Sequence, residues 1–191
     1  MKKNLLLIAV MIMLVSTVSA QEFPKMDASP MDAAYYPNRA AFRAFAKTEE
    51  EKKAGEPKIR VLYSRPQAKE REVFGNLVKY GEVWRIGANE STEVLFYQDV
   101  TIGGTKVKAG RYTMYATAQE NEWEVMFSTD KDGWGQYAFK PEETTVAKIT
   151  VPTKKTPETL EALAIVFEKA DGGANMIIGW ENTMVSVPIV F

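Results

Sequence analysis

The sequence predicts an all-β fold, a β-sandwich or jelly-roll-like domain of about nine or ten short strands with a short helical arm at its N-terminus. Three observations predict it. Stretches rich in β-favouring residues recur from residue 58 onward. Gly, Asn, Asp and Pro separate these stretches, as turn residues do. Helix-favouring sequence is concentrated before residue 58. Together these features are typical of a single sandwich domain.

Residues 1–20 have the pattern of a signal peptide. Lys2 and Lys3 are basic, the apolar stretch Leu5–Val15 follows, and Ala20 provides the small residue of a cleavage site. The apolar stretch is shorter than the roughly twenty residues needed to cross a bilayer. We therefore expect cleavage, export to the periplasm or out of the cell, and no membrane insertion afterwards. A retained membrane anchor is the alternative.

The composition excludes several classes of function. The chain has no Cys, so neither a disulfide framework nor a lipid-bearing N-terminal Cys is expected. It has no His, which excludes Ser-His-Asp and Cys-His catalysis, His-ligated haem and the usual zinc sites. We expect no cofactor and no metal. The 24 basic and 25 acidic residues form no basic stripe, so nucleic acid is not an expected partner.

Residues 21–57 are expected to form an N-terminal arm, and residues 58–191 the sandwich domain. The arm begins with the turn-rich, aromatic piece SPMDAAYYP. Helix-favouring sequence follows in RAAFRAFAKTEEEKKAGEP, and Gly55 and Pro57 end the predicted helix. Its charge run, residues 49–53, is interpreted as a solvated helix surface.

The first predicted strands of the domain lie in KIRVLYS and EVLFYQDV. The second of these has apolar residues on both faces, which is typical of a strand covered on both sides. A hairpin at Gly103-Gly104 and a further turn at Ala109-Gly110 are predicted in TIGGTKVKAGRYTMYAT.

The next strand, WEVMF, alternates so that Trp123, Val125 and Phe127 face the core. Asp132-Gly133 in TDKDGWG predicts a hairpin turn, because the later acidic ligands of a Ca²⁺ loop are missing. Four further strands are predicted in VAKITVP, LEALAIVFEKA, NMIIGW and MVSVPIVF. LEALAIVFEKA also suits a helix by composition, but its neighbours on both sides favour a strand.

Polar and aromatic residues gather at the ends of the predicted strands, where a ligand is most accessible. Arg is suited to a bidentate grip on a carboxylate, either a neighbour's or a ligand's. In one interpretation Arg85 pairs with Glu90, and Arg65 with Glu181, to fix loops. In the other, some of these groups face a cleft that binds an anion or a sugar. The candidate ligand-binding residues are Tyr63, Arg65, Trp84, Arg85, Asn89, Glu90, Trp180, Glu181 and Asn182.

The four Trp residues have two interpretations each, as a cap on the core or as a surface that stacks on a sugar ring. Trp123 lies in an alternating strand and is expected in the core. Trp84 and Trp180 flank polar loop residues and suit either role. Trp134 lies in a predicted turn, so it is expected to be the most exposed.

Several motifs together resemble one family, domain of unknown function 2911, found in exported proteins of Bacteroidetes and related bacteria. The resemblance covers residues 27–37 and 58–191. At Ile86 the family pattern often has Thr, so a hydroxyl role is absent at this position. The resemblance implies a compact β-rich fold and export, and it implies no established activity or catalytic residue. The motifs are SPMDAAYYP, YSRPQAKEREVFGNLVKYGEVWRIGANESTEVLF, VTIGGTKVKAGRYTMYA, WGQY and GWENTMVSVPI.

Three functions follow from these residues. The preferred one is binding of a small polar ligand, carbohydrates included, by Arg85, Asn89, Glu90 and nearby aromatic side chains. The second is a structural or protein-interaction module of the cell envelope. The third is a carboxylate-dependent hydrolase, which requires Glu90 and Glu181 to face one cleft. The sequence carries no signal for an oligomeric state.

Overall fold

The computed structural model describes residues 21–191 except residue 138, so the predicted signal peptide lies outside the described residues. In the described part, strands make up 53% and helices 9%, which confirms the all-β prediction. Within it, no helix is long and apolar enough to cross a membrane. The elements are β1 (Met31–Tyr36), η1 (Ala40–Phe45), α2 (Glu49–Ala54), β2 (Ile59–Ser64), β3 (Val83–Trp84), β4 (Thr92–Phe96), β5 (Val100–Ile102), β6 (Thr105–Val107), β7 (Gly110–Ala118), β8 (Glu122–Ser128), α3 (Pro141–Thr144), β9 (Thr145–Ala170) and β10 (Gly173–Val190).

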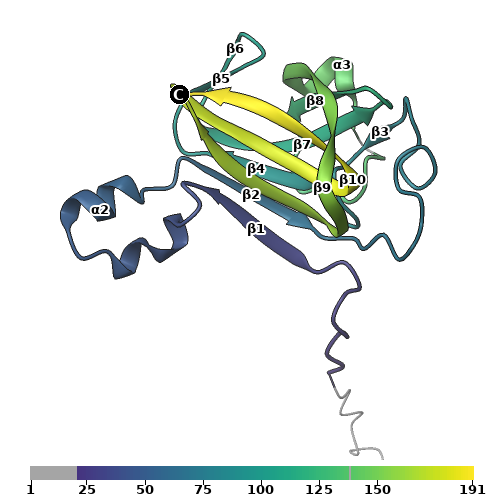
Figure 1. Cartoon of the computed structure of the whole chain (residues 1–191), viewed down its shortest axis with the longest axis horizontal. Helices are drawn as coiled ribbons and strands as arrows, with labels where there is room; N and C mark the ends of the chain where they lie inside the picture. Colours follow the sequence, from purple (N-terminus) through teal and green to yellow (C-terminus); the bar gives the residue numbers. More distant parts are fainter. Residues whose placement is uncertain (1–20, 138) are drawn as a thin grey trace, which may run out of the picture.

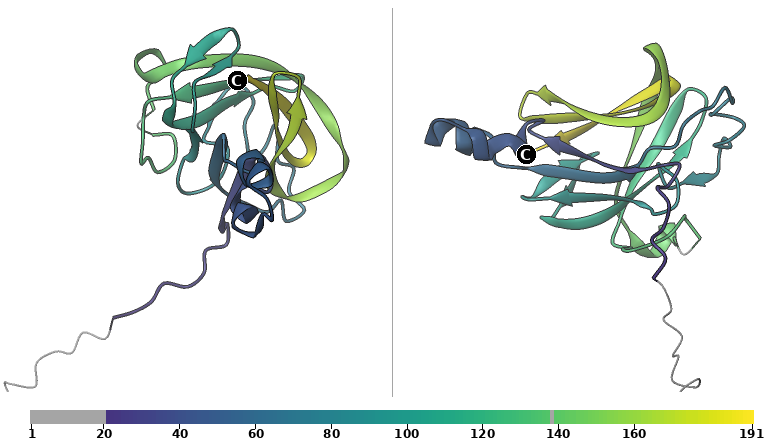
Figure 2. Two further views of the ribbon diagram at one scale, coloured as in Figure 1. Left: turned by 90° about the vertical axis from the view of Figure 1, so that its left-hand side faces the viewer. Right: turned by 90° about the horizontal axis from the view of Figure 1, so that it is seen from below.

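The strands form one antiparallel sheet in the order β1-β2-β4-β7-β8-β9-β10-β5-β6, with β3 paired to β7 beside this path (Figure 1). The strand β9 belongs to both halves of the sheet. Its first part pairs with β8 and its last part with β10. The long β9–β10 hairpin therefore folds back over the other strands, and the two layers enclose the core (Figures 1 and 2).

The core contains the side chains that the alternating pattern predicted. Trp123, Val125 and Phe127 of β8 are fully buried, as expected. At one end of the core an aromatic cluster forms, in which the ring of Trp123 lies 4.9 Å from that of Phe74 and 5.6 Å from that of Trp84. Complete burial of such side chains stabilises the fold by about 1.5–3 kcal/mol each. The cluster thus anchors the loops at this end.

The N-terminal arm differs from its prediction first because Met31–Tyr36 is a strand. All six residues of β1 pair antiparallel with β2 at the edge of the sheet. Only Ala34 of the strand is buried, so no apolar alternation marks it in the sequence. An edge strand needs a partner on one side only, which explains how so exposed a segment joins the sheet.

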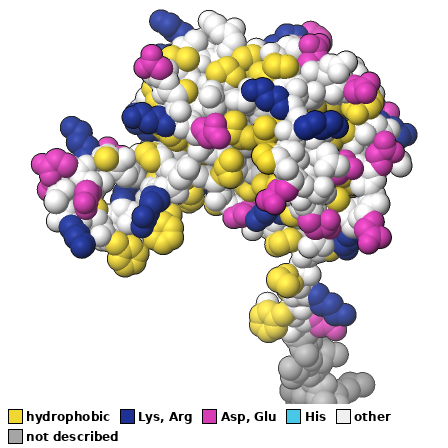
Figure 3. Space-filling model, in the orientation of Figure 1, with side chains coloured by type: hydrophobic (Ala, Val, Ile, Leu, Met, Phe, Trp, Pro, Cys, Tyr) yellow, Lys and Arg dark blue, Asp and Glu magenta, His cyan; other side chains and the backbone are white. Residues whose placement is uncertain are grey.

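The helical part of the arm consists of two short helices instead of one. The hydroxyl of Thr48 caps the second helix by accepting a hydrogen bond from the Glu51 amide at 3.1 Å, and Gly55 ends it, as predicted. The first helix leaves Phe42 and Phe45 exposed, at 57% and 80%. Hydrophobic side chains are visible on the projecting arm (Figure 3).

Three predicted connections are wrong. The predicted strands VAKITVP and LEALAIVFEKA are one long strand, β9, and residues 181–183, between the predicted strands NMIIGW and MVSVPIVF, lie inside β10. A bulge there shifts the register on both sides of Glu181, whose φ is +54°, so polar residues interrupt the apolar pattern without ending the strand. Asp132-Gly133 is not a hairpin turn either. It lies in the long segment between β8 and β9, which includes α3.

Candidate functional site

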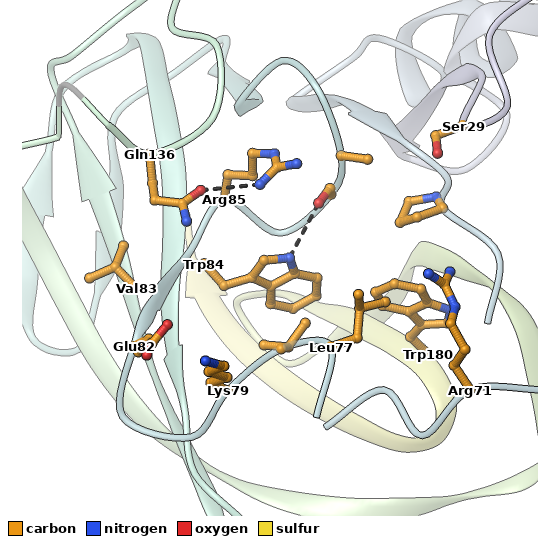
Figure 4. A pocket seen from close by; sticks show the side chains of 14 residues that line it. Ser29, Arg71, Leu77, Lys79, Glu82, Val83, Trp84, Arg85, Gln136 and Trp180 are labelled. Atoms are coloured by element: carbon orange, nitrogen blue, oxygen red, sulfur yellow. Dashed lines mark hydrogen bonds between the residues drawn. The ribbon is translucent and has the colours of Figure 1, made fainter. Parts of the chain in front are cut away.

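A pocket of about 300 Å³ lies at the end of the sandwich that holds the aromatic cluster. One wall is the loop from Arg65 to Glu82, and the other is the segment VWRIGANEST, residues 83–92, which begins with β3 and ends at the start of β4. The rings of Trp84 and Trp180 form its floor, stacked at 6.0 Å with an interplanar angle of 22° (Figure 4). The charged and polar side chains that line it are Ser29, Arg71, Lys79, Glu82, Arg85 and Gln136.

Side-chain hydroxyls hold the VWRIGANEST wall in place. The Ser64 hydroxyl donates to the Ala88 carbonyl at 2.5 Å and accepts from the Ala88 amide at 2.6 Å. The Thr92 hydroxyl donates to the Ile86 carbonyl at 2.6 Å. A Cβ on Gly87 would lie 2.8 Å from the Ser64 hydroxyl, so this position admits only glycine without a shift. The turn is therefore held in place by hydroxyl groups, and its charged side chains are not needed to hold it.

Arg85 has no counter-charge among the residues that the structure describes. Its Nη1 donates to the Gln136 side-chain oxygen at 3.1 Å, and its Nε is buried without a hydrogen-bond partner. No carboxylate among residues 21–191 forms an ion pair with it. Burial lowers the pKa of the guanidinium, and the nearby Tyr137 hydroxyl partly offsets this. A half-buried charge without a counter-charge, and with one donor unsatisfied, does not help folding, so it calls for another explanation.

The predicted pairing of Arg85 with Glu90 is wrong. Glu90 is exposed, and its backbone forms a bridge with Trp134 on the far side of the segment. It lines a groove beside Trp134 rather than the pocket. Because the turn reverses direction at Asn89, whose φ is +59°, Glu90 lies away from Arg85.

The predicted pairing of Arg65 with Glu181 is also wrong. Arg65 pairs with Asp32 at 3.1 Å and donates from Nε to the Leu163 carbonyl at 2.9 Å. Asp32 belongs to the strand β1 that was not predicted. Glu181 accepts from the Val73 amide at 3.2 Å and so fixes the pocket loop to β10.

The hydrolase hypothesis required Glu90 and Glu181 to face one cleft. Glu90 lines the groove beside Trp134, whereas Glu181 lines neither that groove nor the pocket. Asp130 and Asp132 are engaged elsewhere, the first with the Tyr115 hydroxyl at 3.0 Å and the second with Arg111 at 2.9 Å. In the described part of the chain, no three metal-ligating side chains come together.

The remaining predicted ligand-binding residues differ in their exposure to solvent. Tyr63 is buried, and its hydroxyl accepts from the Ile165 amide at 3.0 Å, so it links the two layers. Burial raises the pKa of this tyrosine. Asn182 accepts from the Thr159 hydroxyl at 2.8 Å on the surface, away from the pocket. Of the nine predicted residues, the pocket is lined by Trp84, Arg85 and Trp180.

The pocket also contains residues that the sequence did not single out. Arg71 donates to the carbonyls of Gln67 and Ala68 and forms no ion pair with a described residue, and neither does Lys79. With Arg85 they place three cations against the single carboxylate of Glu82 (Figure 4). The charge-rich stretch between β2 and β3 was the available signal. The pocket is thus positively charged in a chain of net charge −1.

Comparison with known proteins places the chain in a family. No curated protein and no solved structure matches it significantly. One family model matches residues 46–189, a range that begins in the arm and includes every charged residue of the pocket. The chain therefore belongs to the family described as protein of unknown function (DUF2911).

Proposed function

We propose that the protein binds a small anionic ligand, a sugar acid or another carboxylate- or phosphate-bearing molecule, with the anionic group on Arg85. One observation carries the proposal: the Arg85 guanidinium is half-buried, and no described carboxylate neutralises it. Charge-assisted hydrogen bonds between Arg and an oxyanion are about twice as strong as neutral ones. A bound anion provides the counter-charge that Arg85 lacks among the described residues.

The surroundings of Arg85 suit such a ligand. Arg71 and Lys79 add positive charge on the facing loop. Trp84 and Trp180 give the pocket an apolar floor, and a few placed polar groups over apolar walls are typical of ligand sites. A volume of about 300 Å³ accepts a molecule the size of one sugar ring.

Thermal unfolding with panels of acidic and neutral small molecules tests the proposal. Uronic acids and sugar phosphates are expected to stabilise the wild-type protein, and a ligand at a hundred times its Kd adds about 2.7 kcal/mol. Arg85→Ala should abolish the shift. Arg43→Ala is the matched control, because Arg43 lies on the arm and bonds only within its own helix, to the Ala40 carbonyl. Binding that survives Arg85→Ala, or flat curves across the acidic panel, would refute the proposal.

A second candidate, a protein-interaction module of the cell envelope, is favoured by the exposed Phe42 and Phe45 of the arm. It predicts association that a Phe42→Ser, Phe45→Ser double variant removes. Light scattering across protein concentrations, with and without cell-envelope extract, measures it. If neither condition shows association, this candidate loses its support.

A further inference from the structure

Two aromatic side chains lie exposed beside the pocket and stack on each other. Trp134 is 61% exposed and Tyr137 79%, and their rings lie 6.0 Å apart with an interplanar angle of 21°. Both belong to the segment WGQY between β8 and β9. We call this pair the aromatic platform. The other three Trp residues are at most 6% exposed, so Trp134 is the exception among the four.

The platform has a fixed backbone. The Ser91 amide donates to the Gly133 carbonyl at 3.0 Å, and the Gly135 amide donates to the Asn89 carbonyl at 2.7 Å. The Ser91 hydroxyl also donates to the Gly135 carbonyl. These bonds attach WGQY to the outer edge of VWRIGANEST. The segment is therefore held in position although its aromatic side chains contribute nothing to the core.

Glycine at position 135 permits the stacked arrangement. Its φ is +72°, and a Cβ there would lie 2.6 Å from the Tyr137 ring. Any other residue would displace that ring. The ring thus lies back over its own backbone, nearly parallel to the ring of Trp134.

The platform is joined to the pocket through one residue. Gln136 lies between the two aromatic residues in sequence, and its side chain accepts the hydrogen bond from Arg85. The cationic pocket and the platform are therefore two neighbouring parts of one surface. The first part suits an anionic group, and the second offers flat apolar faces to water.

From this juxtaposition we propose that the site binds an acidic oligosaccharide. Its acidic sugar occupies the Arg85 pocket, and a neighbouring sugar ring stacks on Trp134 and Tyr137. This inference rests on the proposed function and narrows its ligand class. The C–H face of a pyranose is apolar and its rim is polar, which matches an exposed aromatic pair bordered by polar loop atoms. A ligand with a single ring does not need the platform.

Fluorescence offers a selective readout. Because Trp84, Trp123 and Trp180 are buried, acrylamide quenching of the folded protein reports chiefly on Trp134. Galacturonic acid, short oligogalacturonates and neutral cello-oligosaccharides serve as the probes. We expect oligogalacturonates to protect the fluorescence from quenching and to bind more tightly than the monomer. Neutral oligosaccharides should bind far more weakly.

Variants separate the two parts of the site, and their affinities are measured by isothermal titration calorimetry because Trp134 is itself the fluorescent reporter. Trp134→Ala should weaken oligogalacturonate binding about tenfold, which corresponds to 1.4 kcal/mol, and leave monomer binding unchanged. Trp134→Phe should restore most of the affinity, which excludes a folding defect. Arg85→Ala should abolish binding of both. Tyr97→Ala, which removes an exposed tyrosine next to the arm, is the control that should change neither.

Three results would overturn the inference. If Trp134→Ala binds oligomer and monomer as wild type does, the platform has no role, while the anion pocket survives. If neutral oligosaccharides bind as tightly as acidic ones, the ligand class is wrong. If neither the monomer nor the oligomer binds, but inorganic phosphate binds through Arg85, the saccharide assignment fails and the proposed anion site does not.

Discussion

Replacing Arg85 with Met should change the stability of the protein very little. The variant loses the hydrogen bond from Nη1 to Gln136, and a hydrogen bond to a charged group contributes about 1.5–3 kcal/mol. It also removes a buried Nε donor without a partner, and an unsatisfied buried donor costs about 1–3 kcal/mol. Met keeps the apolar stem. The two terms oppose each other, so we expect a net change within about 1 kcal/mol of zero.

Urea unfolding of Arg65→Met provides the comparison. Arg65 bonds Asp32 of β1 and the Leu163 carbonyl of β9, so its removal leaves a carbonyl without its donor and should cost about 1–3 kcal/mol. The unfolding midpoints of both variants are compared with that of wild type at unchanged slope. If Arg85→Met is destabilised by as much as Arg65→Met, Arg85 has a structural role, and the anion proposal loses its basis.

Three further predictions concern the elements around the pocket. Ser64→Ala removes both partners of Ala88 and should lower the free energy of unfolding by about 1–3 kcal/mol in urea titrations, whereas Trp134→Ala should leave it within about 0.5 kcal/mol. Gly87→Ala should destabilise by pushing against Ser64, and Ser64→Ala in the same chain should relieve part of that loss in a double-mutant cycle. Burial raises the pKa of Tyr115 to about 12, so its contribution to stability is complete below pH 10 and is lost as the pH rises towards 12. Tyr115→Phe should show a smaller loss of stability between pH 10 and 12, measured by urea midpoints.

The predictions from sequence succeeded where burial imposes a period on the chain. The side chains of WEVMF alternate between core and surface, so Trp123, Val125 and Phe127 were placed correctly. The strand β1 was missed because an edge strand buries little and shows no period. The bulge at Glu181 was read as a link because polar residues interrupted the pattern there, although the backbone pairing continues on both sides.

The candidate site was predicted less well, for a physical reason. The partner of a charged side chain depends on strand register and on the direction of the loop. Neither can be read from the pattern of residues alone. Arg65 reaches Asp32 only because β1 pairs with β2, and Glu90 leaves Arg85 only because the backbone reverses at Asn89. The pocket also depends on a loop whose charges are scattered along the sequence. Composition could show those charges but not that they converge.

The segment VWRIGANEST connects two surfaces, and its residues divide accordingly. Gly87 and Thr92 of the segment, together with Ser64 of β2, account for its fold, and they do so without any charged group. On one side of this fixed turn Arg85 lines a cationic pocket, and on the other the backbone of Asn89 and Ser91 holds the aromatic platform. Neither a guanidinium without a counter-charge nor two exposed aromatic rings would stabilise the turn. Their joint presence on one rigid support is therefore better explained by a ligand that spans both.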